Sequence, residues 1–221
     1  MNNLEIKLSN DGSHTLYNKE LNENYHSTNG AIQEANHVFI KSGLEPIIGS
    51  KRSLTIVEMG FGTGLNALLT ANYAKLTKQQ IHYIGIEAYP VEEEMIAKLN
   101  YPEILGGDSQ KHFDKIHAAK WDGIGLVNNY FTLQKVASKL EDFKPRKAID
   151  LVFYDAFGPQ VQSEVWDINL FDKLFNFMSD KGVFVTYCAK GQVRRDLESV
   201  GFKMERLEGP PGKREMLRGT K

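Results

Sequence analysis

The chain has 221 residues, of which 41% are apolar and 25% are charged, a balance typical of one globular domain with a full core. It excludes a fibrous chain and a disordered tail. The 27 basic and 28 acidic side chains leave a net charge of −1, so no overall attraction to nucleic acid is expected.

The lack of a recognisable targeting signal and the low cysteine content both favour a cytoplasmic protein. No apolar run reaches the roughly 18 residues needed to cross a bilayer. The first twenty residues carry Glu5, Lys7 and Asp11 where a signal peptide needs an apolar stretch. The single cysteine, Cys188, excludes an internal disulfide and agrees with a reducing compartment. The sequence therefore predicts a cytoplasmic protein with no membrane association.

Residues 1–50 are expected to form a small amino-terminal extension packed on a main domain of residues 51–221. Apolar alternation at 4–8 and 15–17, around the turn signal Asp11-Gly12, indicates a hairpin. Helical spacing of apolar residues follows over 31–44.

From residue 54, short apolar runs alternate with helical stretches, which is typical of an α/β fold with a doubly wound parallel sheet. Strands are predicted at 54–57, 82–86, 131–136, 149–154 and 183–187, and helices at 65–76, 91–99, 110–118, 171–178 and 192–199. Two further strands, at 202–207 and 215–220, are joined by a linker too short for a crossover helix, so they must pair antiparallel. A seven-stranded, mostly parallel sheet of this kind is similar to that of Rossmann-like class I methyltransferases.

The strongest chemical signal is a glycine-rich stretch directly after the first strand of the main domain. Gly60, Gly62 and Gly64 let the backbone turn sharply and let a ligand approach closely. Glu58 would repel a pyrophosphate but suits a cationic amino group, such as that on the methionine part of S-adenosylmethionine. The alternative is a glycine turn needed only for packing. The predicted cofactor contacts in this stretch are Glu58, Gly60, Phe61, Gly62, Thr63, Gly64 and Asn66.

Glu87 ends the second strand, 23 residues beyond Gly64, where a carboxylate accepts hydrogen bonds from ribose hydroxyls. Taken alone, it also fits an exposed acid at a strand end. A third side chain should contact the adenine near the end of the third strand. Ser138, Lys139 and Glu141 all remain open for that role.

Asp155 follows the apolar fourth strand, at the end where the transferred methyl group lies in this fold. Methyl transfer needs a neutral lone pair aligned with the methyl carbon, so positioning should supply most of the acceleration. Asp155 can accept N–H bonds from an amine and either orient its neutral form or relay its proton away. It is the predicted catalytic residue and also a cofactor contact. A structural turn before Gly158-Pro159 is the alternative.

The carboxyl-terminal segment is basic, with nine Lys or Arg against five Asp or Glu over 190–221. Lys190 and Arg194 begin a helix, whose amino terminus favours anions. Lys213 and Arg214 lie in a loop expected to overhang the same sheet edge. These four side chains are predicted phosphate contacts, with an ordinary solvated surface as the alternative. The six histidines show no metal-ligand spacing, so no metal is predicted.

Several stretches in order resemble the MnmD methyltransferase family, which is the methyltransferase half of the bifunctional tRNA-modifying enzyme MnmC. They are 58–66 (EMGFGTGLN), 155–159 (DAFGP), 186–191 (TYCAKG) and 209–216 (GPPGKREM). The opening segments 12–16 and 22–27 are also similar to the family. The family's usual Asp-Gly-Phe-Ala-Pro reads Asp-Ala-Phe-Gly-Pro in this chain.

The resemblance implies methyl transfer from S-adenosylmethionine to the 5-aminomethyl group of a wobble uridine in the tRNA anticodon loop, giving 5-methylaminomethyluridine, often 2-thiolated. Asp155 falls on the family's active-site aspartate. Tyr25, Phe157 and Trp166 are the aromatic side chains that are candidates for stacking on the splayed base, and Tyr25 and Phe157 are the predicted substrate contacts. The chain ends at Lys221, without the flavin-dependent half of the bifunctional enzyme, so no FAD is expected to bind. A small-molecule N-methyltransferase and a non-catalytic RNA-binding module remain as alternatives, and no feature predicts the oligomeric state.

Overall fold

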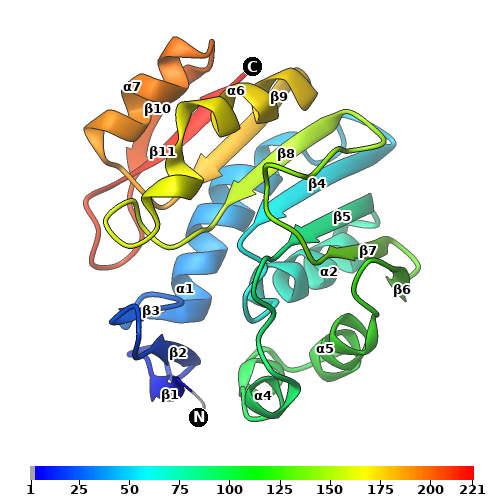
Figure 1. Cartoon of the computed structure of the whole chain (residues 1–221). Coiled ribbons are helices and arrows are strands. Elements are labelled where there is room, and N and C mark those ends of the chain that lie inside the picture. Colours follow the sequence, from blue (N-terminus) through cyan, green and yellow to red (C-terminus); the bar gives the residue numbers. More distant parts are fainter. Residues whose placement is uncertain (1–2) are drawn as a thin grey trace.

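The computed structural model describes residues 3–221, and its centre is an eight-stranded sheet in the order β10-β11-β9-β8-β4-β5-β7-β6 (Figure 1). The strands are β4 (Ser53–Met59), β5 (Gln80–Ile86), β6 (Ile124–Asn128), β7 (Phe131–Val136), β8 (Ile149–Tyr154), β9 (Met178–Thr186), β10 (Lys203–Glu208) and β11 (Glu215–Thr220). The five strands β4, β5, β7, β8 and β9 run parallel. The class I methyltransferase sheet is thus confirmed.

The seven predicted strands are all present, and the predicted antiparallel pairing of β10 with β11 is confirmed. The eighth strand, β6, was not predicted. It pairs antiparallel with β7 at the edge of the sheet and leaves Ile124 and Leu126 exposed, at 64% and 61%. Apolar side chains on the solvent side remove the alternation by which an edge strand is found from sequence.

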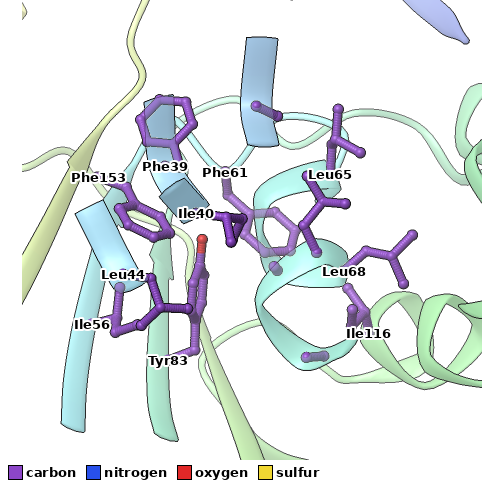
Figure 2. Close-up of a cluster of buried hydrophobic side chains, with 14 of the residues drawn as sticks. Phe39, Ile40, Leu44, Ile56, Phe61, Leu65, Leu68, Tyr83, Ile116 and Phe153 are labelled. Carbon is purple, nitrogen blue, oxygen red and sulfur yellow. The ribbon is translucent and has the colours of Figure 1, made fainter. Parts of the chain in front are cut away.

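Successive side chains of a strand point to opposite faces, so the sheet has a core on each side. In β4, Ile56 packs in one core and Val57 in the other. The first core meets α2 (Leu65–Thr77) and α5 (Ser109–Ala118), and the second meets α6 (Ile168–Phe177) and α7 (Gly191–Ser199). Figure 2 shows the first core between the strands and α2.

The predicted helix at 91–99 is wrong in extent. The structure has two short helices there, α3 (Glu93–Ile96) and α4 (Tyr101–Leu105). Pro102 lies in the first turn of α4, where its missing N–H does no harm, so that a new helix starts instead of the first one continuing. Within residues 3–221, no helix combines the length and the apolar character that crossing a bilayer requires.

The amino-terminal part forms an antiparallel sheet of β1 (Leu4–Leu8), β2 (His14–Asn18) and β3 (Glu23–Asn24), which includes the predicted hairpin. The predicted helix follows as α1 (Ala31–Ala35), which continues into the π-helix η1 (Asn36–Leu44) and the 3-10 turn η2 (Glu45–Ile47). Phe39 and Leu44 of η1 pack against the main sheet (Figure 2). The division at residue 50 stays a prediction, and the first two residues of that extension lie outside the described part.

Candidate active site

A cavity of about 770 Å³ opens at the carboxyl ends of the parallel strands. Its lining includes residues that follow β4, β5, β7, β8 and β9, parts of 18–28, Glu34 of α1 and Lys213 of the loop between β10 and β11. Ligands bind at this edge of open α/β sheets, so the cavity is the candidate active site.

The glycine loop after β4 forms the floor of the cavity. Gly60 has a φ of +87°, and a Cβ at this position would lie 2.5 Å from the backbone oxygen of Asp155. Gly62 has a φ of +49° and would place a Cβ 3.1 Å from the Tyr25 ring. Both line the cavity. The two glycines therefore let the loop pass close to Asp155 and Tyr25, as the sequence pattern required.

Four other predicted cofactor contacts, Phe61, Thr63, Gly64 and Asn66, lie behind the cavity wall. The ring of Phe61 is buried in the first core and packs edge-on against Trp121, with ring centroids 5.8 Å apart (Figure 2). The Thr63 hydroxyl lies 3.3 Å from the hydroxyl of Tyr101. Gly64, at a φ of +73°, precedes the first residue of α2. Of this stretch, Gly60 and Gly62 therefore line the cavity, and the four residues named here do not.

Asn66 links two carboxylates. Its Nδ2 donates to Glu58 Oε1 and to Asp155 Oδ2, each over 2.8 Å. Glu58 is 1% exposed, its Oε2 has no hydrogen-bond partner within the described part, and burial raises its pKa well above the usual range. Asp155 lines the cavity. Asp155 therefore faces the cavity, and Glu58 is buried behind it, with Asn66 bonded to both.

Burial and, to a smaller extent, the charge of Glu34 raise the pKa of Asp155 to about 7, while the Asn66 hydrogen bond and the charge of Lys213 oppose the shift. A carboxyl group that titrates near neutral pH can accept a proton from an amine and release it again. This is the property expected of the predicted catalytic residue.

Asp155→Asn is expected to change how stability depends on pH. Because the folded-state pKa of about 7 exceeds the usual 3.8, Asp155 ionises first in the unfolded chain, and the free energy of unfolding falls as pH rises between these values. The variant lacks this loss. It should be more stable than the parent by about 4 kcal/mol at pH 8 and equally stable near pH 4, as measured by urea unfolding. The same difference at both pH values would contradict the shift.

Glu87 lines the cavity beside the glycine loop. Its Oε2 accepts the Gly62 N–H and its Oε1 accepts the Tyr89 N–H, each over 3.0 Å. Burial raises the pKa of Glu87, and these backbone bonds oppose the shift. Each oxygen keeps a lone pair for a further donor, such as a ribose hydroxyl. Of the three open candidates for the adenine contact, Lys139 and Glu141 line the cavity and Ser138 does not.

The loop after β8 is held in place by hydrogen bonds to its backbone. Trp166 Nε1 donates to the Phe157 carbonyl over 2.7 Å, and the Tyr187 hydroxyl donates to the Ala156 carbonyl over 2.9 Å. Ala156 is not among the non-glycine residues of the described part with positive φ, so alanine fits there. Tyr25 packs edge-on against Phe157 with centroids 5.0 Å apart, and both rings line the cavity.

The structure does not bring the four predicted phosphate contacts together at one place. Lys213 lines the cavity, where it pairs with Glu34 over 2.6 Å. Lys190 donates to Gln160, itself a cavity residue, over 2.6 Å. Arg194 pairs with Glu198 and Arg214 with Glu215, both outside the cavity lining. Their roles toward phosphate stay predictions.

Glu34 and Tyr187 are cavity residues that the sequence analysis missed. A signal existed for Glu34, because it lies three residues after Ala31 and four before Val38, on the face of the helix that packs inward. A charged side chain on such a face needs a buried partner. Tyr187 directly follows β9, at the edge where ligands bind.

In fold, and in sequence over its carboxyl-terminal part, the chain is similar to S-adenosyl-L-methionine-dependent methyltransferases. Residues 113–221 match the family model described as S-adenosyl-L-methionine-dependent methyltransferase. In structure the chain is similar to MNMC2 from Aquifex aeolicus, with a TM-score of 0.78 and 23% identity over 98% of this chain and 70% of that one. It also shares its fold with spermidine synthase from Thermotoga maritima, at a TM-score of 0.52, 11% identity and coverage of 100% and 72%.

Within that class, the chain is similar to proteins named tRNA 5-methylaminomethyl-2-thiouridine biosynthesis bifunctional protein MnmC. The relative from Cupriavidus metallidurans is 32% identical over 95% of this chain and 32% of its own length. The relative from Burkholderia multivorans is 30% identical over 93% of this chain and 33% of its own length. The chain thus spans about a third of the length of these curated relatives.

Proposed function

We propose that this methyltransferase transfers a methyl group to the 5-aminomethyl group of a wobble uridine, 2-thiolated or not, in tRNA. The observation that carries the proposal is Asp155, a carboxyl group with a pKa of about 7 at the cavity edge of the sheet. Such a group suits an amine acceptor. The similarity to relatives named for 5-methylaminomethyl-2-thiouridine biosynthesis supports this acceptor.

The chain's own residues fit the methyl donor. Glu58 carries an unpartnered buried oxygen beneath the glycine loop, which suits a cationic group reached through water. Glu87 lines the cavity with acceptor capacity for ribose hydroxyls, and we infer that Lys139 or Glu141 contacts the adenine, since both also line the cavity. When bound, S-adenosylmethionine supplies an electrophilic methyl group. Direct contacts of Phe61, Thr63, Gly64 and Asn66 with it stay predictions, as does the absence of metal and FAD.

Asp155 prepares the acceptor. An alkylamine reaches the cavity mainly as an ammonium ion, which has no lone pair to attack with. The Asp155 carboxylate accepts one ammonium proton, and its hydrogen bond from Asn66 fixes the direction from which it does so. The neutral nitrogen is then held by Asp155 with its lone pair toward the donor side of the cavity.

The aromatic pair Tyr25 and Phe157 offers a contact surface for a splayed base, since both rings line the cavity and meet edge to face. Lys190, Arg194 and Arg214 would then contact phosphates outside it. A tRNA substrate places the reaction in the cytoplasm.

The test is turnover on tRNA that carries 5-aminomethyl-2-thiouridine, followed by mass spectrometry of the wobble nucleoside. We expect the nucleoside to gain one methyl group, and kcat/KM to fall more than about tenfold when salt rises from about 50 to about 200 mM, because phosphate contacts release counterions. The same assay on the free nucleoside is the control. Efficient, salt-independent methylation of the free nucleoside would favour the small-molecule alternative, and donor binding without any turnover would favour the non-catalytic module.

A further inference from the structure

One ion pair in the cavity joins the two ends of the chain. Lys213 Nζ donates to Glu34 Oε2 over 2.6 Å, although 179 residues separate them. The side chain of Glu34 is only 10% exposed, and its Oε1 accepts the Ser27 N–H over 3.0 Å. Lys213 Nζ also lies 4.0 Å from the centroid of the Tyr187 ring. Both charged partners line the cavity together with Asp155.

The loop that carries Lys213 is closely fitted to the amino-terminal part. Gly212 has a φ of +85°, and a Cβ there would lie 2.0 Å from Nδ2 of Asn29. The Gly209 N–H donates to the Arg214 carbonyl over 3.1 Å, which closes the loop on itself. The lysine is therefore held at Glu34 by the loop backbone as well as by its charge.

Few other charged groups affect the pKa of Asp155. The ionisable side chains whose charges couple to Asp155 from the surrounding elements are Glu34, Glu58, Tyr83, Tyr187 and Lys213. Burial raises the pKa values of Glu58, Tyr83 and Tyr187, which favours the uncharged form of each side chain. Burial also lowers the pKa of His26, the histidine of the cavity, to about 4, which leaves it neutral as well. Glu34 and Lys213 are then the charges that act on Asp155.

We propose that the Glu34–Lys213 pair is a positioning device for the acceptor step: Glu34 keeps Asp155 basic enough to take the ammonium proton, and Lys213 limits that effect so that the proton is released again. The proposal rests on the proposed function, since it assumes an amine acceptor. In the step, one N–H bond of the ammonium breaks and one O–H bond forms on Asp155. The proton then leaves through the open cavity to solvent, and the nitrogen keeps its lone pair.

The two partners act on Asp155 with opposite signs, which gives a test that a purely structural role would not pass. In Glu34→Gln, the lysine charge stays without its partner, so the Asp155 titration should move to lower pH by about one pH unit. In Lys213→Met, the Glu34 charge stays without its partner, so the titration should move to higher pH. The double variant, Glu34→Gln with Lys213→Met, should return toward the parent.

The measurement is NMR of the full chain with ¹³C-labelled aspartate, in which the Asp155 carboxyl signal is assigned by its absence from Asp155→Asn. This titration needs no acceptor, so it stays valid even if tRNA proves not to be the substrate. Shifts of the same sign in both single variants, or an unchanged titration in Glu34→Gln, would overturn the proposal. Should Glu34→Gln fail to fold, the Lys213→Met titration decides alone, and no upward shift would overturn the proposal.

Activity supplies the second readout. The acidic limb of the pH profile of kcat/KM should move together with the Asp155 titration in each variant. It should move to lower pH in Glu34→Gln and to higher pH in Lys213→Met. Asp150→Asn is the matched control, because Asp150 is also a buried acid paired with a lysine, Lys51, but lies at the opposite end of β8. It should lower stability without moving the limb. An equal movement of the limb in Asp150→Asn would show that lost stability causes it and would overturn the proposal.

Discussion

Asp155→Ala is expected to lower kcat at least about a hundredfold while leaving the affinity for S-adenosylmethionine within a few-fold of the parent value. The variant removes the group that takes the acceptor proton and the oxygen that receives the Asn66 hydrogen bond. The glycine loop and Glu87, which face the donor side of the cavity, remain in place. Single-turnover kinetics and calorimetry with the donor measure the two effects separately.

Asp155→Asn separates orientation from proton transfer. Asparagine keeps an oxygen for Asn66 but does not take a proton, so its turnover should be nearly as low as that of Asp155→Ala. Turnover close to the parent in the asparagine variant would show that orientation alone suffices. Turnover close to the parent in the alanine variant would remove Asp155 from the active site.

Gly60→Ala is expected to abolish measurable donor binding, a loss of more than about a hundredfold in affinity. A left-handed backbone costs about 1–2 kcal/mol for an L-residue. In addition, the new Cβ would lie 2.5 Å from the Asp155 oxygen and 2.9 Å from its carbonyl carbon, and backbone atoms do not move aside as a flexible side chain does. The loop must shift away from the Asp155 segment, and the donor side of the cavity then loses its shape. Calorimetry with S-adenosylmethionine measures the loss.

Gly12→Ala is the matched control for this effect. Gly12 has a φ of +83°, close to the +87° of Gly60, but no atom lies within 4 Å of its Cβ position. It should cost about 1 kcal/mol of stability and leave donor binding unchanged. If Gly60→Ala still binds the donor and loses no more stability than Gly12→Ala, the close approach to Asp155 is not the reason that position 60 needs glycine. Backbone strain alone would then explain the glycine.

The main sheet was predictable because its signals are local. The central strands β4 and β8 are short runs buried on both faces, and the glycine loop directly follows β4. Asp155 was found for the same reason, since a polar residue after an apolar strand lies at the ligand edge. The edge strand β6 was missed because Ile124 and Leu126 point to solvent, against the usual pattern.

The acceptor side depends on contacts between distant parts of the chain, and sequence patterns do not report these. The pairing of Lys213 with Glu34 of α1 was not predicted, and the role of Lys213 toward phosphate stays a prediction. Phe61 was expected to contact the cofactor from its place in the motif. That contact stays a prediction, and the position of its side chain over Gly85, where a Cβ would lie 2.2 Å from the Phe61 ring, was not predicted. Both outcomes are set by packing between segments, which a motif does not encode.

The cavity lining has two main origins: residues at and after the strand ends, and Tyr25, Glu34 and their neighbours from the first fifty residues. We therefore expect that exchanging the opening segment for that of a relative would alter which acceptor the cavity admits, while the glycine loop and Glu87 stay unchanged.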